Sequence, residues 1–174
     1  MIAPPIPVIE TERLCLRGPD ARDLPAFIAH YGSDRSRFTG GPVAPAQAWR
    51  VFASAIGHWT LRGFGLWTVT RRGSEAALGL IGCLEPEGWP EREIAWSLFE
   101  GAEGHGFATE AARAARSFAY GTLGWRTAVS YIDEANVRSL AVAQRLGCRI
   151  DPGAAVPEGF TCRVHRHPAP EAAT

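Results

Sequence analysis

The chain has 174 residues, of which 46% are hydrophobic and 21% are charged. That is the size and composition of one globular domain with a hydrophobic core, which excludes intrinsic disorder of the whole chain. Its 18 basic residues balance its 18 acidic residues, and this neutral balance argues against a nucleic-acid binder, which needs a basic excess.

The first half of the chain carries strand patterns and two helical patterns. Alternating polar and apolar residues predict half-buried strands, and apolar residues at helical spacing predict amphipathic helices. The strands are expected over residues 12–17, 64–70, 77–84 and 93–99. The helices are expected over 24–31, with Asp20 as a possible cap, and over 49–59, where Gly63 ends the pattern.

The second half changes character at a glycine-rich loop, after which helices and strands alternate. The elements expected there are a helix over 108–120, a strand over 127–132, a helix over 136–146 and a strand over 161–166. This mixture predicts an α+β (mixed α/β) fold. We divide the chain into an N-terminal leader, a single domain and a flexible C-terminal tail, at residues 1–10, 11–167 and 168–174.

The cysteines and histidines form no pattern of metal ligands. Cysteines stand at positions 15, 83, 148 and 162 without a Cys-x-x-Cys spacing, so we expect reduced core thiols. His165 and His167 share one face of a strand, but no further ligand is spaced to close a site, and no metal is predicted. No apolar run approaches the roughly 20 residues of a membrane span and no secretory signal is visible, so we expect a cytoplasmic protein without a membrane partner.

The strongest chemical signal is the segment 96–111, which runs from a strand through the glycine-rich loop into a helix. This order points backbone N–H groups and the positive end of the helix at one place, which suits a phosphate group. An ordinary tight turn between a strand and a helix would look the same. The spacing is not that of a dinucleotide-binding fold, because Thr109 stands where the third glycine belongs, and no Gly-Lys-Ser/Thr of a phosphate-binding P-loop follows.

Four pieces of the second half stand in a characteristic order. They are Glu93-Ile94-Ala95-Trp96-Ser97-Leu98, then Gly104-His105-Gly106-Phe107-Ala108-Thr109-Glu110-Ala111, then Asn136-Val137-Arg138-Ser139, and then Arg145-Leu146-Gly147-Cys148. Together they resemble the GNAT superfamily of acyl-CoA-dependent N-acetyltransferases, in particular the Rim-type acetyltransferases of ribosomal-protein N-termini. The resemblance implies a central, mostly antiparallel mixed sheet, with a splay between the strands at 93–99 and 127–132 and helices on both faces.

The same resemblance implies acetyl-CoA as co-substrate. In the family, main-chain amides of the glycine-rich loop bind the pyrophosphate, and a splayed strand pairs with the pantetheine arm. The loop residues concerned are Gly104, His105, Gly106, Phe107, Ala108 and Thr109. The backbone of Leu98 and Phe99 would meet the pantetheine, and Asn136 and Ser139 would lie beside the thioester, with Asn136 also capping a helix.

Acetyl transfer to an amine needs a neutral amine, a polarised thioester carbonyl and a proton for the departing thiolate. Glu93, where the splayed strand begins, is our first candidate for the base. Glu85 and Glu134 are runners-up, and each of the three could equally be a solvated carboxylate at a strand end. Ser139 is the candidate hydroxyl beside the sulfur. Glu110 lies in the first turn after the loop, so we assign it to support of the helix dipole and the loop.

Two positions depart from the family pattern. Gly101 stands where Gln or Arg is common, and Ala143 stands where many members place a tyrosine that protonates the thiolate. We expect an N-acetyltransferase that moves an acetyl group to a primary amine by direct attack in a ternary complex. The acceptor would be a protein N-terminus, an amino acid or a small amine. A non-catalytic acyl-CoA-binding sensor or partner module is the alternative.

The acceptor side of the site is less defined by the sequence. Aromatic residues that could line an acceptor pocket, or simply fill the core, are Trp59, Phe64, Trp67, Trp89 and Trp96. The loops expected to shape this pocket, 32–45 and 151–160, carry no strong charge of either sign, which disfavours a highly cationic acceptor. The protein is expected to be a monomer or a homodimer.

Overall fold

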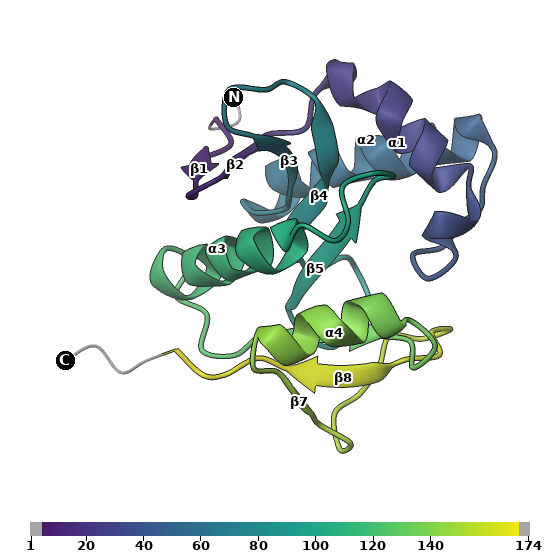
Figure 1. The fold of residues 1–174 in the computed structure, drawn as a ribbon. Helices are drawn as coiled ribbons and strands as arrows, with labels where there is room; N and C mark the ends of the chain where they lie inside the picture. Colours follow the sequence, from purple (N-terminus) through teal and green to yellow (C-terminus); the bar gives the residue numbers. More distant parts are fainter. Residues whose placement is uncertain (1–4, 171–174) are drawn as a thin grey trace.

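An eight-stranded sheet forms the centre of this computed structural model, which describes residues 5–170 (Figure 1). The strand order is β1-β2-β3-β4-β5-β6-β8-β7. The strands are β1 (Ile9–Glu10), β2 (Leu14–Arg17), β3 (Leu66–Arg71), β4 (Ala77–Leu84), β5 (Glu93–Leu98), β6 (Val129–Ile132), β7 (Arg149–Ile150) and β8 (Arg163–Arg166). Neighbouring strands are antiparallel except β5 and β6, so the expected mostly antiparallel mixed sheet is confirmed.

Helices cover both faces of the sheet. They are α1 (Leu24–Tyr31), α2 (Pro45–Arg62), α3 (Phe107–Gly121) and α4 (Val137–Arg145), with short 3-10 helices at Ala21–Asp23 and Asp34–Ser36. Figure 1 shows α3 and α4 in front of the sheet and α1 and α2 behind it. None of the helices within residues 5–170 has the length and apolar character needed to cross a membrane.

The strands β5 and β6 part after a single residue pair, Glu93 opposite Val129, whereas β4 follows β5 through six pairs. In an antiparallel ladder, alternate residues turn their backbone groups to one neighbour. Phe99 donates its N–H to Leu78 O of the β4 side at 2.8 Å, so the backbone groups of Leu98 and Trp96 face the gap instead. The predicted splay between these two strands is confirmed.

The N-terminal segment takes part in the sheet more than its assignment as a leader suggested. Residues Ile9 and Glu10 pair with β2, and Trp67 Nε1 donates a hydrogen bond to Pro7 O at 2.7 Å. Residues 1–4 of the leader and 171–174 of the expected tail lie outside the described residues. The helix α2 is longer than predicted because Pro45, suited to a first helical turn, begins it four residues before its apolar stripe.

The helix α3 lies close to β4 and β5 because its inward face is built from small side chains. Ala111, Ala112, Ala115 and Ala119 are completely buried. On β4, the thiol of Cys83 contacts Ala115 O at 3.8 Å, and burial raises the pKa of this thiol to about 12. Cys83 is therefore the reduced core thiol that was expected, while the other three free cysteines are only half-buried.

Replacement of Ala115 by leucine is expected to lower the free energy of unfolding by about 1–3 kcal/mol, because the added methyl groups have no space between α3 and β4. Thermal and urea unfolding measure the effect. Ser117→Leu, at an exposed position of the same helix, is the control and should change stability by less than about 0.5 kcal/mol. Equal stability of both variants would show that the contact between helix and sheet is loose.

Candidate active site

The glycine-rich loop ends in a helix N-terminus that has no side-chain cap. Gly104 and Gly106 have φ angles of 78° and 79°, in the region that favours glycine, and Gly106 occupies the N-cap position of α3. The first N–H groups of a helix have no partner within it. A Cβ added at Gly104 would meet nothing within 4 Å. These N–H groups and the open space beside the loop suit a phosphate group.

Side chains from the start of the chain support the loop. Arg13 donates to His105 O at 3.0 Å and to the Glu110 carboxylate at 2.7 Å, and Thr11 Oγ1 donates to the same carboxylate at 2.6 Å. Partial burial alone would raise the pKa of Glu110, but these hydrogen bonds lower it, so the carboxylate is charged. The ring of His105 stacks on Phe107 with centroids 5.3 Å apart. The structure thus places Glu110 in support of the loop.

A cavity of about 1570 Å³ begins at this loop and continues past the splay to the α1–α2 side of the sheet. From the predicted loop residues it is lined by Gly104, Gly106, Phe107, Ala108 and Thr109, whereas the side chain of His105 is exposed outside it. Leu98, Phe99, Glu93, Asn136 and Ser139 also line it. The structure therefore brings together all predicted site residues except the His105 side chain.

The two strand residues expected beside pantetheine, Leu98 and Phe99, turn their backbone N–H groups to opposite sides of β5. The N–H of Phe99 is already bonded to Leu78 O, and its ring packs against Phe27 with centroids 6.3 Å apart. Since alternate residues of β5 face the gap, the backbone N–H of Leu98 faces the gap and that of Phe99 faces β4. The role of both residues beside pantetheine stays a prediction.

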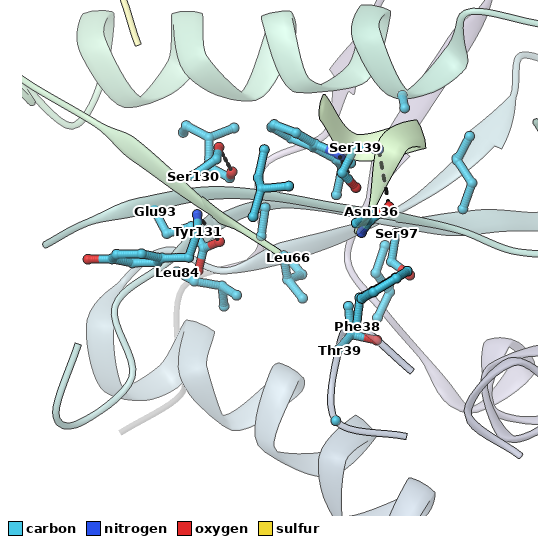
Figure 2. A pocket seen from close by; sticks show the side chains of 18 of the residues that line it. Phe38, Thr39, Leu66, Leu84, Glu93, Ser97, Ser130, Tyr131, Asn136 and Ser139 are labelled. Carbon is cyan, nitrogen blue, oxygen red and sulfur yellow. Dashed lines mark hydrogen bonds between the residues drawn. The ribbon is translucent and has the colours of Figure 1, made fainter. Parts of the chain in front are cut away.

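Asn136 and Ser139 meet in the first turn of α4. Asn136 Oδ1 accepts the Ser139 N–H at 3.2 Å, which makes Asn136 the N-cap of this helix. Trp96 Nε1 donates to Ser139 Oγ at 3.2 Å, so the hydroxyl acts as acceptor toward β5 and its own proton is available to the cavity. Figure 2 shows Ser139 and Asn136 close together. Ala143, one turn further, is buried and offers no hydroxyl.

Glu93 lies at the point where β5 and β6 part, with only 8% of its surface exposed. Trp89 Nε1 donates to one carboxylate oxygen at 2.8 Å, and the Tyr131 N–H donates to the other at 3.3 Å. Burial raises the pKa of Glu93 to about 7, although the two hydrogen bonds oppose the shift. A carboxylate with a pKa near neutrality is suited to accept a proton at physiological pH. Figure 2 shows Glu93 beside Tyr131.

The two runner-up carboxylates lie elsewhere. Glu85 accepts a hydrogen bond from Arg92 at 3.3 Å, and Glu134 is exposed and paired with Arg163 at 2.6 Å. Neither lines the cavity. Among the three candidate carboxylates, Glu93 is therefore the one that lines the cavity.

Buried histidines near the site were missed: His30 lines the cavity, whereas His167 contacts the lining residue Ser130 without lining the cavity itself. His30 Nε2 on α1 lies 3.0 Å from Ser97 Oγ of β5, and burial lowers the pKa of His30 to about 4. Ser130 Oγ donates to Ile94 O at 2.5 Å and contacts His167 Nε2 at 2.9 Å, and burial lowers the pKa of His167 to about 3. Both imidazoles are therefore neutral at pH 7. Within residues 5–170, no group of three potential ligand side chains is placed to hold a metal ion.

The fold and this site define the class of protein. Residues 13–149 match the family model described as the acetyltransferase (GNAT) domain, so the chain belongs to the GNAT acetyltransferase family. Members of this family use acetyl-CoA as co-substrate, and the open glycine loop, the uncapped α3 and the divided sheet fit this molecule.

Solved structures agree with this assignment. An acetyltransferase from Agrobacterium tumefaciens is 36% identical, with a TM-score of 0.89 and coverage of 96% of this chain and 97% of that one. A GNAT-family acetyltransferase from Bacillus anthracis, 18% identical, has a TM-score of 0.73, with 92% and 96% coverage. The ribosomal-protein acetyltransferase RimL, 17% identical, has a TM-score of 0.70 with 92% coverage of both chains. The last two show a common fold.

Proposed function

We propose that the protein is an acetyl-CoA-dependent N-acetyltransferase that moves an acetyl group to a primary amine by direct attack in a ternary complex. The observation that supports this most strongly is Glu93. Its carboxylate is buried where β5 and β6 part, lines the cavity and has a pKa of about 7. A base at this place is what an amine needs in order to become a nucleophile.

The residues of the site divide the chemistry among them. Glu93 accepts a proton from the ammonium form of the acceptor, whose nitrogen then bonds to the thioester carbonyl carbon. Backbone N–H groups on the β5 edge that faces the gap, at Trp96 and Leu98, stabilise the negative charge on the carbonyl oxygen. When the carbon–sulfur bond breaks, Ser139 Oγ donates its proton to the departing thiolate and takes the second proton of the attacking nitrogen, so the hydroxyl is restored and the amide becomes neutral. The first proton stays on Glu93 until it is released to solvent. The products are the acetylated amine and the free thiol.

A panel of peptides, amino acids and small amines tests the proposal when release of the free thiol from acetyl-CoA is followed with a thiol reagent. At least one amine should give release that depends on both enzyme and acceptor. Analysis by mass spectrometry should find the product 42 Da heavier, the mass that one acetyl group adds. Release of thiol without any acetylated product would instead show hydrolysis.

The burial of Ala143, where many family members have a tyrosine, favours one other candidate function: a protein that binds an acyl-CoA without turnover. The two functions predict different results in the same experiment. Binding of acetyl-CoA by calorimetry, with no thiol release on any acceptor, would support the sensor function and refute the transferase.

Replacement of Ser139 by alanine is expected to lower kcat by about tenfold or more at every pH tested, because protonation of the thiolate does not depend on the ionisation of the acceptor. KM for acetyl-CoA should rise if the hydroxyl also touches the co-substrate. The matched control is Ser117→Ala, on the exposed face of α3. A loss that disappears at high pH would contradict the assigned role.

A further inference from the structure

Three aromatic side chains lie near Glu93, in the part of the cavity where β5 begins. Trp89 lies near Phe160, with ring centroids 5.2 Å apart and planes at 78°, and near Tyr131, at 6.2 Å and 89°. All three residues line the cavity, as Glu93 does. They come from separate parts of the chain: the turn before β5, the strand β6 and the loop before β8. We call Trp89, Tyr131 and Phe160 the aromatic cluster.

Hydrogen bonds fix the cluster relative to the carboxylate. Trp89 donates to Glu93 Oε2 through its indole N–H, and Tyr131 donates to Glu93 Oε1 through its backbone N–H. The Tyr131 hydroxyl accepts the Glu91 N–H at 3.1 Å, which holds the far end of that ring. Rings and carboxylate therefore form one preorganised wall.

Phe160 differs from the other two rings because 47% of its surface is exposed. A ligand that covered this ring would remove its apolar surface from water, which would stabilise the complex. Nearby on the cavity wall, Glu87 is 98% exposed at its side chain and paired with Arg62. A cation in this part of the cavity would therefore be attracted by the ring faces, by Glu93 and by Asp133, which also lines the cavity.

Aromatic faces attract ammonium groups, and several rings at steep angles to one another are the usual way to hold one. We propose that the aromatic cluster is an ammonium-binding subsite that receives an acceptor with one cationic amine on an apolar carbon skeleton. This inference rests on the proposed function, because the amine is placed beside the carboxylate that takes its proton.

The test uses choline and its uncharged isostere 3,3-dimethylbutan-1-ol, titrated by NMR into the protein without acetyl-CoA. The two probes have the same shape and hydroxyl, so the difference isolates the positive charge. We expect choline to bind at least about fivefold more tightly. Phe160→Leu should remove most of that preference, and Phe160→Tyr, which keeps a ring, should retain it.

Trp49→Leu is the matched control, because Trp49 is 55% exposed on α2 and lies outside the cavity lining. Equal affinity for the two probes, or an unchanged preference in Phe160→Leu, would overturn the inference. The result is independent of turnover. Selective choline binding in a protein that acetylates no amine would refute the proposed function alone, and acetylation without choline selectivity would refute the subsite alone.

Discussion

Replacement of Glu93 by glutamine is expected to lower kcat/KM for the amine by about 100-fold at pH 7, the usual scale for loss of a general base. Because burial raises the pKa of Glu93 to about 7, the wild-type rate should rise with pH as this carboxylate loses its proton around pH 7. The variant should lack that inflection. Its deficit should shrink at high pH, where the amine is already neutral in solution.

The control for this experiment is Glu134→Gln, which changes an exposed carboxylate outside the cavity and should leave the rate unchanged. Glutamine has one acceptor oxygen for the two N–H donors at this position, from Trp89 and Tyr131. The melting temperature of Glu93→Gln must therefore be measured, and rates compared only well below it. Full activity in the folded variant would assign the base to another group or to water.

Replacement of Gly106 by valine is expected to weaken acetyl-CoA binding by at least about 100-fold. Two causes act together. The φ of 79° is strongly disfavoured for a β-branched residue, and the side chain would stand beside the N–H groups that are proposed to hold the diphosphate. Calorimetric titration with acetyl-CoA measures the loss. Gly104→Val should behave alike, since its φ is 78° and its Cβ would enter open space.

A glycine far from the cavity separates backbone strain from a blocked site. Gly124 also has a positive φ, 70°, and a Cβ added there would meet nothing within 4 Å, but it does not line the cavity. Gly124→Val should lose stability to a similar extent and keep the wild-type Kd. An unchanged Kd in a folded Gly106→Val variant would remove the loop from the binding site.

The long elements could be predicted from the sequence because each repeats its apolar pattern over several turns or residue pairs. The alanine stripe of α3 predicted both the helix and its close approach to the sheet. By contrast, β1 and β7 have two residues each, too few for an alternation to be visible. They exist because β2 and β8 offer edges to pair with.

Some features of the site could likewise be predicted from the sequence, and others could not. Its loop and the α4 cap are contiguous motifs, and both were found where the sequence predicted them. The contact of His30 with Ser97 joins residues 67 positions apart, and no local pattern reports such a pair. The raised pKa of Glu93 likewise depends on burial and on Trp89 and Tyr131, which only the fold brings together. The pairing of β5 with β4 determines which backbone groups of β5 face the gap, and this pairing is known only from the fold.

The single residue pair between β5 and β6 also affects how this molecule unfolds locally. On one side lie β1 to β5, and on the other β6 to β8; the Ser130–Ile94 hydrogen bond reinforces the seam at its closed end. Few main-chain bonds cross this seam, so it is a natural boundary between two cooperative units in hydrogen exchange. A molecule that forms hydrogen bonds with the backbone of β5 in the gap would replace the main-chain hydrogen bonds that β6 does not make there. If acetyl-CoA binds along this edge, as we propose, its binding would also make the sheet more rigid, so binding affinity and protection from hydrogen exchange would rise together.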